Sequence, residues 1–199
     1  IFVVKKHSFV ERLVVQLNKK ERHMKFLPSY INGKERELYK ETEDGQEIFY
    51  YEDNNLIIRN FVPEDANAWC CYMHPDFLKR RPNEKKYIIK DIKERIKRDL
   101  NPEYSSDDIL EFTCCLSRKN GQMFGTMVLK EFPKKEEKEQ RMRITLFING
   151  KDKSILKKNT LEALKALRDE YCWYENITIQ QKNTDEEISL DEEIKKYEK

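Results

Sequence analysis

Hydrophobic residues occupy every second position between residues 141 and 148. The hydrophobic set is Met142, Ile144, Leu146 and Ile148. A period of two predicts a β-strand. Further along, leucines recur at helical spacing, at Leu161, Leu164 and Leu167. Because the residues between the two patterns are rich in lysine, this part of the chain predicts a strand, a lysine-rich loop and a helix.

The predicted helix has a start signal at Asn159. Its side chain can cap the first turn, and Glu162, three residues later, can reach back to it. The backbone N–H groups of Asn159 and Thr160 would then face the loop. The lysines of that loop are Lys151, Lys153, Lys157 and Lys158. Unpaired helix-start amides beside cations favour an anion such as phosphate. The alternative interpretation of such a charge run is an ordinary solvated turn.

The same two periods predict the other elements. The strands are expected at 48–51, 56–59, 110–116, 123–129 and 176–180. The helices are expected at 9–21, at 66–73 after a start at Pro63, and from the residues after Pro82-Asn83 to Leu100. Asn120-Gly121 is a tight-turn signal, so the strands on either side of it are expected to form an antiparallel hairpin.

Two segments resemble the GNAT superfamily of N-acetyltransferases, closest to its ribosomal-protein-acetylating branch. One is the strand at 141–148 with Thr160–Leu167; the other is Asn55–Phe61 followed by Pro63-Glu64-Asp65-Ala66. The resemblance implies an α/β (α+β) fold: a mixed, mostly antiparallel central sheet flanked by helices. It places this domain at 55–199 without the usual last strands, after an N-terminal extension at 1–54 that carries a helix and a strand. The sheet is expected to be shorter there, or to be completed by Ile1–Lys6.

The lysine-rich loop departs from the family pattern. That branch has two glycines just before the helix, where this chain has Leu156 and Lys158. Glycine there lets a backbone approach a pyrophosphate closely. Gly150 is the nearby glycine, and it stands early in the predicted loop.

The resemblance implies acetyl-CoA as a cosubstrate, with no metal. Lys153, Lys157 and Lys158, with the amides of Asn159 and Thr160, are expected to hold the pyrophosphate, and Asn183 to contact the pantetheine. A backbone N–H of Phe147 or Ile148 is expected to polarise the thioester carbonyl. The acceptor is expected to be an amine of a protein, a peptide or a small molecule.

Three side chains are candidates for proton transfer. The resemblance implies that Tyr197, in the phrase Lys196-Tyr197-Glu198-Lys199, protonates the departing thiolate; the alternative is a half-buried ring in a charged helix. Glu111 and His74 are candidate general bases, His74 because its ordinary pKa suits the role. In the family the region between the first two helices borders the acceptor site, which here holds Trp69, Tyr72, His74 and Phe77. Core packing is the alternative for these side chains.

Composition narrows the class of protein. The chain has 199 residues, a formal charge of +2 and 38% charged residues, so an overall attraction to nucleic acid or to an anionic membrane is not expected. No apolar run approaches the roughly 20 residues of a membrane span. The odd count of five cysteines and the absence of a CxxC pair argue against a disulfide framework and against zinc. These features favour a cytoplasmic protein, and they leave the oligomeric state open, a homodimer included.

Two other functions compete with the acetyltransferase. A catalytically inactive protein could keep this fold as a binding or interaction module, which the missing glycines favour. A nucleic-acid-binding module has only the basic helix at Lys85–Arg98 in its favour, and Asp91, Glu94 and Asp99 blunt its charge. The retained helix phrase favours the acetyltransferase, although a function carried over from a fold is an analogy.

Overall fold

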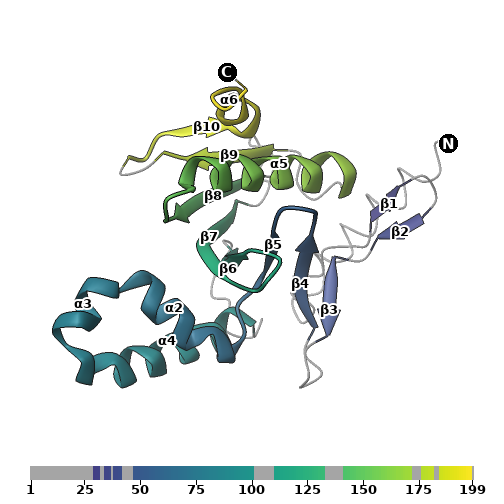
Figure 1. Cartoon of the computed structure of the whole chain (residues 1–199). Helices are drawn as coiled ribbons and strands as arrows, with labels where there is room; N and C mark the ends of the chain where they lie inside the picture. Colours follow the sequence, from purple (N-terminus) through teal and green to yellow (C-terminus); the bar gives the residue numbers. More distant parts are fainter. Residues whose placement is uncertain are drawn as a thin grey trace.

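A computed structural model describes residues 29–31, 34–36, 38–41, 47–100, 110–132, 141–171, 176–181 and 184–198 (Figure 1). The predicted helix at 9–21, the segment Ile1–Lys6 and Asn183 lie outside the described residues.

One sheet organises the described chain. Its eight strands lie in the order β10-β9-β8-β7-β6-β5-β4-β3 (Figure 1). The bounds are β3 Tyr39–Glu41, β4 Glu47–Glu52, β5 Ile57–Asn60, β6 Leu110–Ser117, β7 Met123–Phe132, β8 Arg141–Ile148, β9 Asn176–Gln180 and β10 Glu187–Ser189. All neighbours are antiparallel except β8 and β9, which are parallel and are joined through α5. Two short strands, β1 Ser29–Ile31 and β2 Lys34–Arg36, form a separate hairpin.

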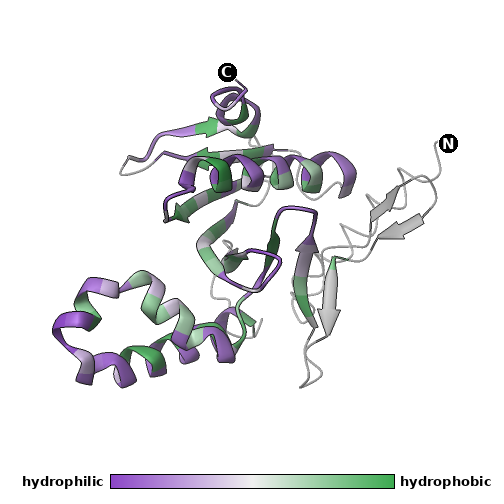
Figure 2. Ribbon diagram, viewed as in Figure 1, coloured by the Kyte–Doolittle hydropathy of each residue, from purple (hydrophilic) through white to green (hydrophobic). Residues whose placement is uncertain are grey.

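Helices cover both faces of this sheet. They are α2 Ala66–Met73, α3 Pro75–Arg80, α4 Lys85–Leu100, α5 Lys153–Tyr171 and α6 Leu190–Lys195, with short 3-10 turns at Pro63–Asp65 and Pro82–Glu84. Hydrophobic and hydrophilic segments alternate along α4 and α5, as expected for helices with one buried side (Figure 2).

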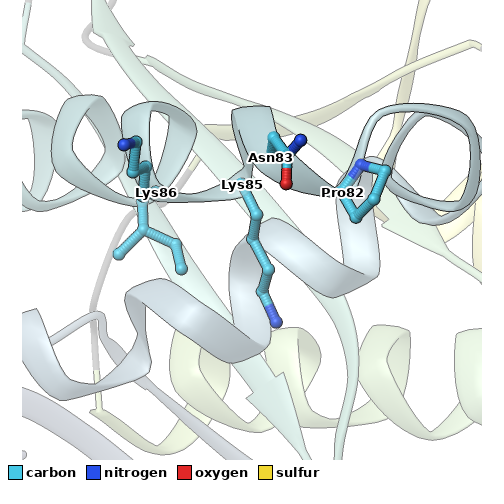
Figure 3. Close-up of a pocket in the computed structure, with 5 residues that line it drawn as sticks. Pro82, Asn83, Lys85 and Lys86 are labelled. Atoms are coloured by element: carbon cyan, nitrogen blue, oxygen red, sulfur yellow. The ribbon is translucent and has the colours of Figure 1, made fainter.

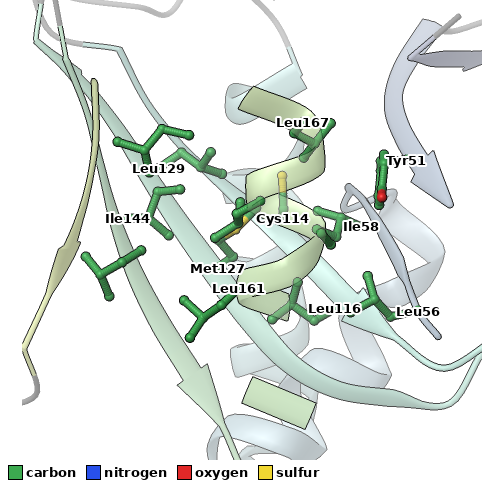
Figure 4. Close-up of a cluster of buried hydrophobic side chains, with 14 of the residues drawn as sticks. Tyr51, Leu56, Ile58, Cys114, Leu116, Met127, Leu129, Ile144, Leu161 and Leu167 are labelled. Carbon is green, nitrogen blue, oxygen red and sulfur yellow. The ribbon is translucent and has the colours of Figure 1, made fainter. Parts of the chain in front are cut away.

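The alternation of β6 explains how the two faces differ. Phe112, Cys114 and Leu116 belong to the main core, which packs beneath the buried leucines of α5 (Figure 4). Cys115 points the other way, into a smaller core with Ala66 and Trp69 of α2 and Ile96 of α4. In that smaller core the rings of Phe61 and Trp69 stack at a centroid distance of 4.1 Å. The α2–α4 helices and α5 therefore lie on opposite faces of the sheet.

The predicted fold class is confirmed. From β5 to β9 the described chain has the strand, two-helix, three-strand, helix and strand order that the resemblance implies, with the short α3 added between α2 and α4, in a mostly antiparallel GNAT-like sheet. The hairpin around Asn120-Gly121 is confirmed as well, and Gly121 has the positive φ of 80° that favours glycine. Residues 38–41 and 47–52, which belong to the predicted extension, share the sheet and core with the rest, through Leu38, Phe49 and Tyr51.

The elements that were not predicted include α3 and the short strands β1, β2, β3 and β10. β10 lies beside β9, where the expected last strands were thought to be missing. Its Glu187 accepts hydrogen bonds from Arg141 at 2.5 Å and from the hydroxyl of Thr178 at 2.7 Å. A three-residue strand has too little sequence pattern to be recognised, so these long-range contacts are what reveal it.

Asp99 makes the stability of the α4–β6 contact dependent on pH. Burial raises the pKa of its carboxyl to about 6, against the opposing effect of Arg95. A raised carboxyl pKa stabilises the fold below about pH 4, and this contribution is lost as the pH rises through 6. We expect Asp99→Asn to raise the free energy of unfolding by about 2 kcal/mol at pH 7.5 and to leave it unchanged near pH 3.5. Urea denaturation at both pH values measures this, with the exposed Asp91→Asn as control; equal effects of the two variants at pH 7.5 would contradict it.

Candidate functional site

The parallel pair β8–β9 ends partway along β8. Its register runs from Arg141 opposite Asn176 to Ile144 opposite Ile179. β8 continues to Ile148, still paired with β7 as far as Gly125. Within the described residues, no strand continues β9 alongside the last part of β8, and the arrowheads of the two strands lie apart (Figure 1). The hydroxyl of Thr145 still donates to the side chain of Gln180 at 2.6 Å. From Leu146 to Ile148, no described strand pairs with this edge of β8, and we call this stretch the open edge.

The register decides which backbone groups face the open edge. The N–H of Asn149 donates to the carbonyl of Phe124 at 3.3 Å. Because hydrogen-bonded pairs alternate along an antiparallel ladder, Phe147 directs its backbone groups toward β7. Leu146 and Ile148 then direct theirs toward the open edge. Of the two predicted donors, Ile148 lies on the open edge and Phe147 does not; Leu146, which was not predicted, does.

The helix after β8 begins earlier than predicted. α5 starts at Lys153, and its first helical hydrogen bond runs from the N–H of Leu156 to the carbonyl of Asp152 at 2.9 Å. Asn159 is inside the helix, so the predicted cap is wrong. Thr160 is fully buried, and its hydroxyl donates to the carbonyl of Leu156 at 2.8 Å, which hides a polar group within the core. The amides of Asn159 and Thr160 therefore lie past the first turn.

The actual start of α5 is exposed and close to the end of β8. Four residues, Asn149 to Asp152, join the two elements, and among them Gly150 has a φ of 117°, which favours glycine. Gly150 therefore lies in the turn just before the helix, which corrects its expected place too early in a long loop. The N–H groups of Lys153, Ser154 and Ile155 precede the first helical bond, and these side chains are exposed.

The charges around the start of α5 differ from those expected. Lys151 and Lys153 are exposed there. Asp152 also stands there, and its carboxylate accepts a hydrogen bond at 3.1 Å from Arg118 of the β6–β7 turn. Lys158 lies one turn into the helix and pairs with Glu162 at 3.8 Å. An anion at this entrance would therefore meet the amides, two lysines and one carboxylate.

Lys157 forms an ion pair with a buried carboxylate. Its ammonium donates to Glu193 of α6, which also accepts from Lys196 at 2.7 Å and whose side chain is 2% exposed. Burial lowers the pKa of Lys157, but the hydrogen bond and charge of Glu193 outweigh it, and the net shift is upward. The same ammonium lies 5.6 Å from the ring centre of Tyr197. Glu193 was not predicted; the terminal run of acids and lysines gave no sign that one acid is buried.

Tyr197 packs against the main core beyond the end of α6. It is half-buried, as the alternative interpretation expected, and its N–H donates to the carbonyl of Ile194 at 2.8 Å. Leu146 of the open edge packs against the same core. Tyr197, Lys157 and Glu193 thus form one cluster at the α5–α6 contact.

The two candidate bases lie apart from each other. Glu111 is exposed and pairs with Lys130 at 3.7 Å. Lys130 is opposite Arg143, which precedes Ile148 by five residues, or about 16 Å along a strand. His74 is exposed between α2 and α3, with its ring edge-on to Phe77 at 6.5 Å.

The aromatic residues of the α2 region were candidates either for the border of the acceptor site or for core packing, and Trp69 and Tyr72 differ in this respect. Trp69 is 6% exposed and belongs to the smaller core. Tyr72 is half-buried and reaches across to the strands, with its hydroxyl 2.9 Å from the carbonyl oxygen of Phe124 and 2.8 Å from that of Phe147. Trp69 is therefore a packing residue, whereas Tyr72 reaches the end of β8.

A separate open depression lies at the start of α4. It has a volume of about 400 Å³ (Figure 3). Its lining residues are Pro82, Asn83, Lys85, Lys86 and Ile89. None of them borders the open edge of β8 or the start of α5. Elsewhere in the described part of the chain, no helix is long and apolar enough to cross a membrane, and no group of three or more His, Cys, Asp or Glu side chains is placed to hold a metal.

Comparisons with known proteins give one distant structural similarity. No family model matches the chain, and no curated protein matches it. The chain is similar to the crystal structure of a protein from Sphaerobacter thermophilus DSM 20745 that is assigned as an acetyltransferase. The two are 17% identical with a TM-score of 0.39, over 65% of this chain and 70% of that one. The GNAT-like fold assignment rests on the topology of the sheet described above.

Proposed function

We propose that this protein is an N-acetyltransferase that moves the acetyl group of acetyl-CoA to a primary amine by direct attack. The observation that carries the proposal is the open edge of β8 leading, through a four-residue turn, into the exposed start of α5. A pantetheine arm can extend along unpaired strand groups, and a pyrophosphate suits the amides at a helix start. Acetyl-CoA contains both a pantetheine arm and a pyrophosphate.

The backbone would contribute most of the chemistry. The N–H of Leu146 or Ile148 would donate to the thioester oxygen, where negative charge develops as the amine attacks. A new carbon–nitrogen bond forms, the carbon–sulfur bond breaks, and the thiolate takes up a proton while the nitrogen loses one. Holding the amine against the thioester supplies much of the acceleration. Tyr197 stays the proposed proton donor to sulfur, and His74 is the better candidate base because Glu111 is paired with Lys130.

The residues proposed for the pyrophosphate change with the position of the helix. Lys151 and Lys153, with the amides of Lys153, Ser154 and Ile155, take the place of Lys157, Lys158, Asn159 and Thr160. Lys157 is unsuited because the buried Glu193 engages it. Asn183 stays a prediction, as do the class of amine acceptor and the cytoplasmic location.

A binding module without catalysis is the second candidate function. The observation that favours it is the carboxylate of Asp152 at the start of α5, in an ion pair with Arg118. A negative charge at that position opposes a pyrophosphate and satisfies part of the helix dipole by itself.

Thermal melting with coenzyme A tests the proposed function. A ligand at about 100 times its dissociation constant stabilises a fold by roughly 2.7 kcal/mol, so we expect a clear rise in Tm at millimolar coenzyme A. The variant Lys151→Glu with Lys153→Glu should lose this rise. Lys90→Glu with Lys93→Glu, which makes the same charge change on exposed residues of α4, should keep it. An unchanged Tm of the wild-type protein would favour the binding module.

A further inference from the structure

Tyr72 joins α2 to the point where β8 ends. Its hydroxyl lies 2.9 Å from the carbonyl oxygen of Phe124, at the start of β7, and 2.8 Å from that of Phe147, near the end of β8. Residues 72 and 147 are 75 positions apart in the chain. One hydroxyl of a helix thus contacts two strands where both reach the end of the sheet.

The hydroxyl also lies against the first residue of the turn before α5. Burial raises the pKa of the Tyr72 phenol to about 12, against the opposing effect of the backbone of Asn149. A phenol with this pKa keeps its proton at neutral pH, so it can donate to the carbonyl oxygens of Phe124 and Phe147. Tyr72 therefore contacts two backbone carbonyl groups at the end of β8.

Gly125 confirms how closely the groups approach one another at this point. A Cβ atom added to Gly125 would lie 2.9 Å from the carbonyl oxygen of Phe147 and 3.1 Å from a methyl carbon of Leu116. The first distance is shorter than real Cβ atoms show, and the second is tight. The Phe147 carbonyl is therefore held between the backbone of β7 and the hydroxyl of Tyr72.

Few other contacts hold the turn at 149–152. The ion pair of Asp152 with Arg118 joins side chains that are 57% and 40% exposed, and such surface pairs contribute little. The hydrogen bond from Asn149 to Phe124 also ties the turn to β7, and the carbonyl of Asp152 accepts the first helical bond of α5. Phenylalanine at this position of Tyr72 would keep the ring and lose only the two contacts of the hydroxyl.

We propose that Tyr72 is a positioning residue for coenzyme A: its hydroxyl fixes the turn 149–152, so that the open edge of β8 and the start of α5 face the same ligand. This inference rests on the proposed function. It also couples α2, on the face of the sheet opposite to α5, to the coenzyme site. Tyr72 would act through the backbone of Phe147, which precedes the turn, and of Phe124, which accepts from Asn149 of the turn, and need not touch the ligand.

Tyr72→Phe tests the inference because it removes only the hydroxyl. We expect the Kd for coenzyme A to rise about threefold to tenfold, the range for one lost hydrogen bond, and the KM for acetyl-CoA to rise with kcat nearly unchanged. Hydrogen exchange at the amides of 149–153 should also become faster in the absence of ligand. The matched control is Tyr51→Phe, which removes a hydroxyl bonded to Asp53 at 3.3 Å, near Tyr171 at the far end of α5.

The outcomes separate this inference from the proposed function. A wild-type protein that binds coenzyme A, with an unchanged Kd in Tyr72→Phe, overturns the inference and leaves the function standing. Equal losses of affinity in Tyr72→Phe and Tyr51→Phe also overturn it, because they indicate a general loss of stability. If the wild-type protein binds no coenzyme A, the proposed function fails; unchanged exchange at 149–153 in Tyr72→Phe would then also overturn the positioning of the turn.

Discussion

Replacing Glu193 with alanine is expected to lower the free energy of unfolding by about 3 kcal/mol. Glu193 is 1% exposed and accepts hydrogen bonds from Lys157 of α5 and Lys196 of its own helix. Without the carboxylate, Lys157 keeps its charge with a side chain only 24% exposed. Losing one partner of a buried pair costs about 3–5 kcal/mol, and the partial access of Lys157 to water places this case at the low end.

Urea denaturation of Glu193→Ala measures this cost. Glu192→Ala is the control, since Glu192 is the exposed neighbour that completes a capping box with Ser189, a contact whose loss costs about 1 kcal/mol. Equal costs for the two variants would mean that the buried ion pairs add nothing to stability.

The same pair predicts how stability responds to acid. Burial alone would raise the pKa of Glu193, but the hydrogen bonds from Lys157 and Lys196 outweigh it and the pKa is lowered. A carboxyl with a lowered folded pKa stabilises the protein above its unfolded pKa, about 4.3, and this contribution is lost as the pH falls through the folded value. The wild-type protein should therefore lose more stability than Glu193→Ala between pH 5 and pH 2.

Lys153→Pro is expected to weaken coenzyme A binding about tenfold or more beyond the severalfold effect of Lys153→Ala. Lys153 is the first residue of α5, where proline is tolerated because that N–H has no partner inside the helix. Proline removes the N–H and the cation, whereas alanine removes the cation alone. A hydrogen bond to a charged group contributes about 1.5–3 kcal/mol, which sets the difference between the two variants.

Isothermal titration with coenzyme A measures both dissociation constants, and thermal melting without ligand checks that both variants fold. Equal dissociation constants in Lys153→Pro and Lys153→Ala would show that the amide at the start of α5 does not hold the pyrophosphate. The site would then have to lie elsewhere on the open edge.

The sheet could be predicted from the sequence because its signals are local. The two-residue period of β8 and the Asn120-Gly121 turn each depend on neighbours in the chain, and both are confirmed. The helical stripe of Leu161, Leu164 and Leu167 is also local, and all three are buried. These elements needed no knowledge of their partners.

The predicted start of α5 was wrong because a capping pattern in the sequence suggested a later start than the tertiary packing of the helix produces. Asn159 and Glu162 form a plausible capping box by sequence alone. The helix begins earlier because Leu156 packs into the main core and Thr160 can be buried once its hydroxyl bonds within the helix. Thr160 is polar, so in the sequence the apolar stripe of the helix seemed to begin only after it, at Leu161.

The sequence by itself determined the strands β4 to β9, most of the helices and their order along the chain, because side-chain periodicity is a property of neighbouring residues. Only the tertiary structure decided which groups form the candidate site. Pairing with β7 turned Leu146 and Ile148, and not Phe147, toward the open edge. Glu193 forms an ion pair with Lys157, 36 residues away in the chain, and Tyr72 donates a hydrogen bond to Phe147, 75 residues away. The physical reason is that these pairings depend on the register and packing of distant elements, which no local pattern encodes.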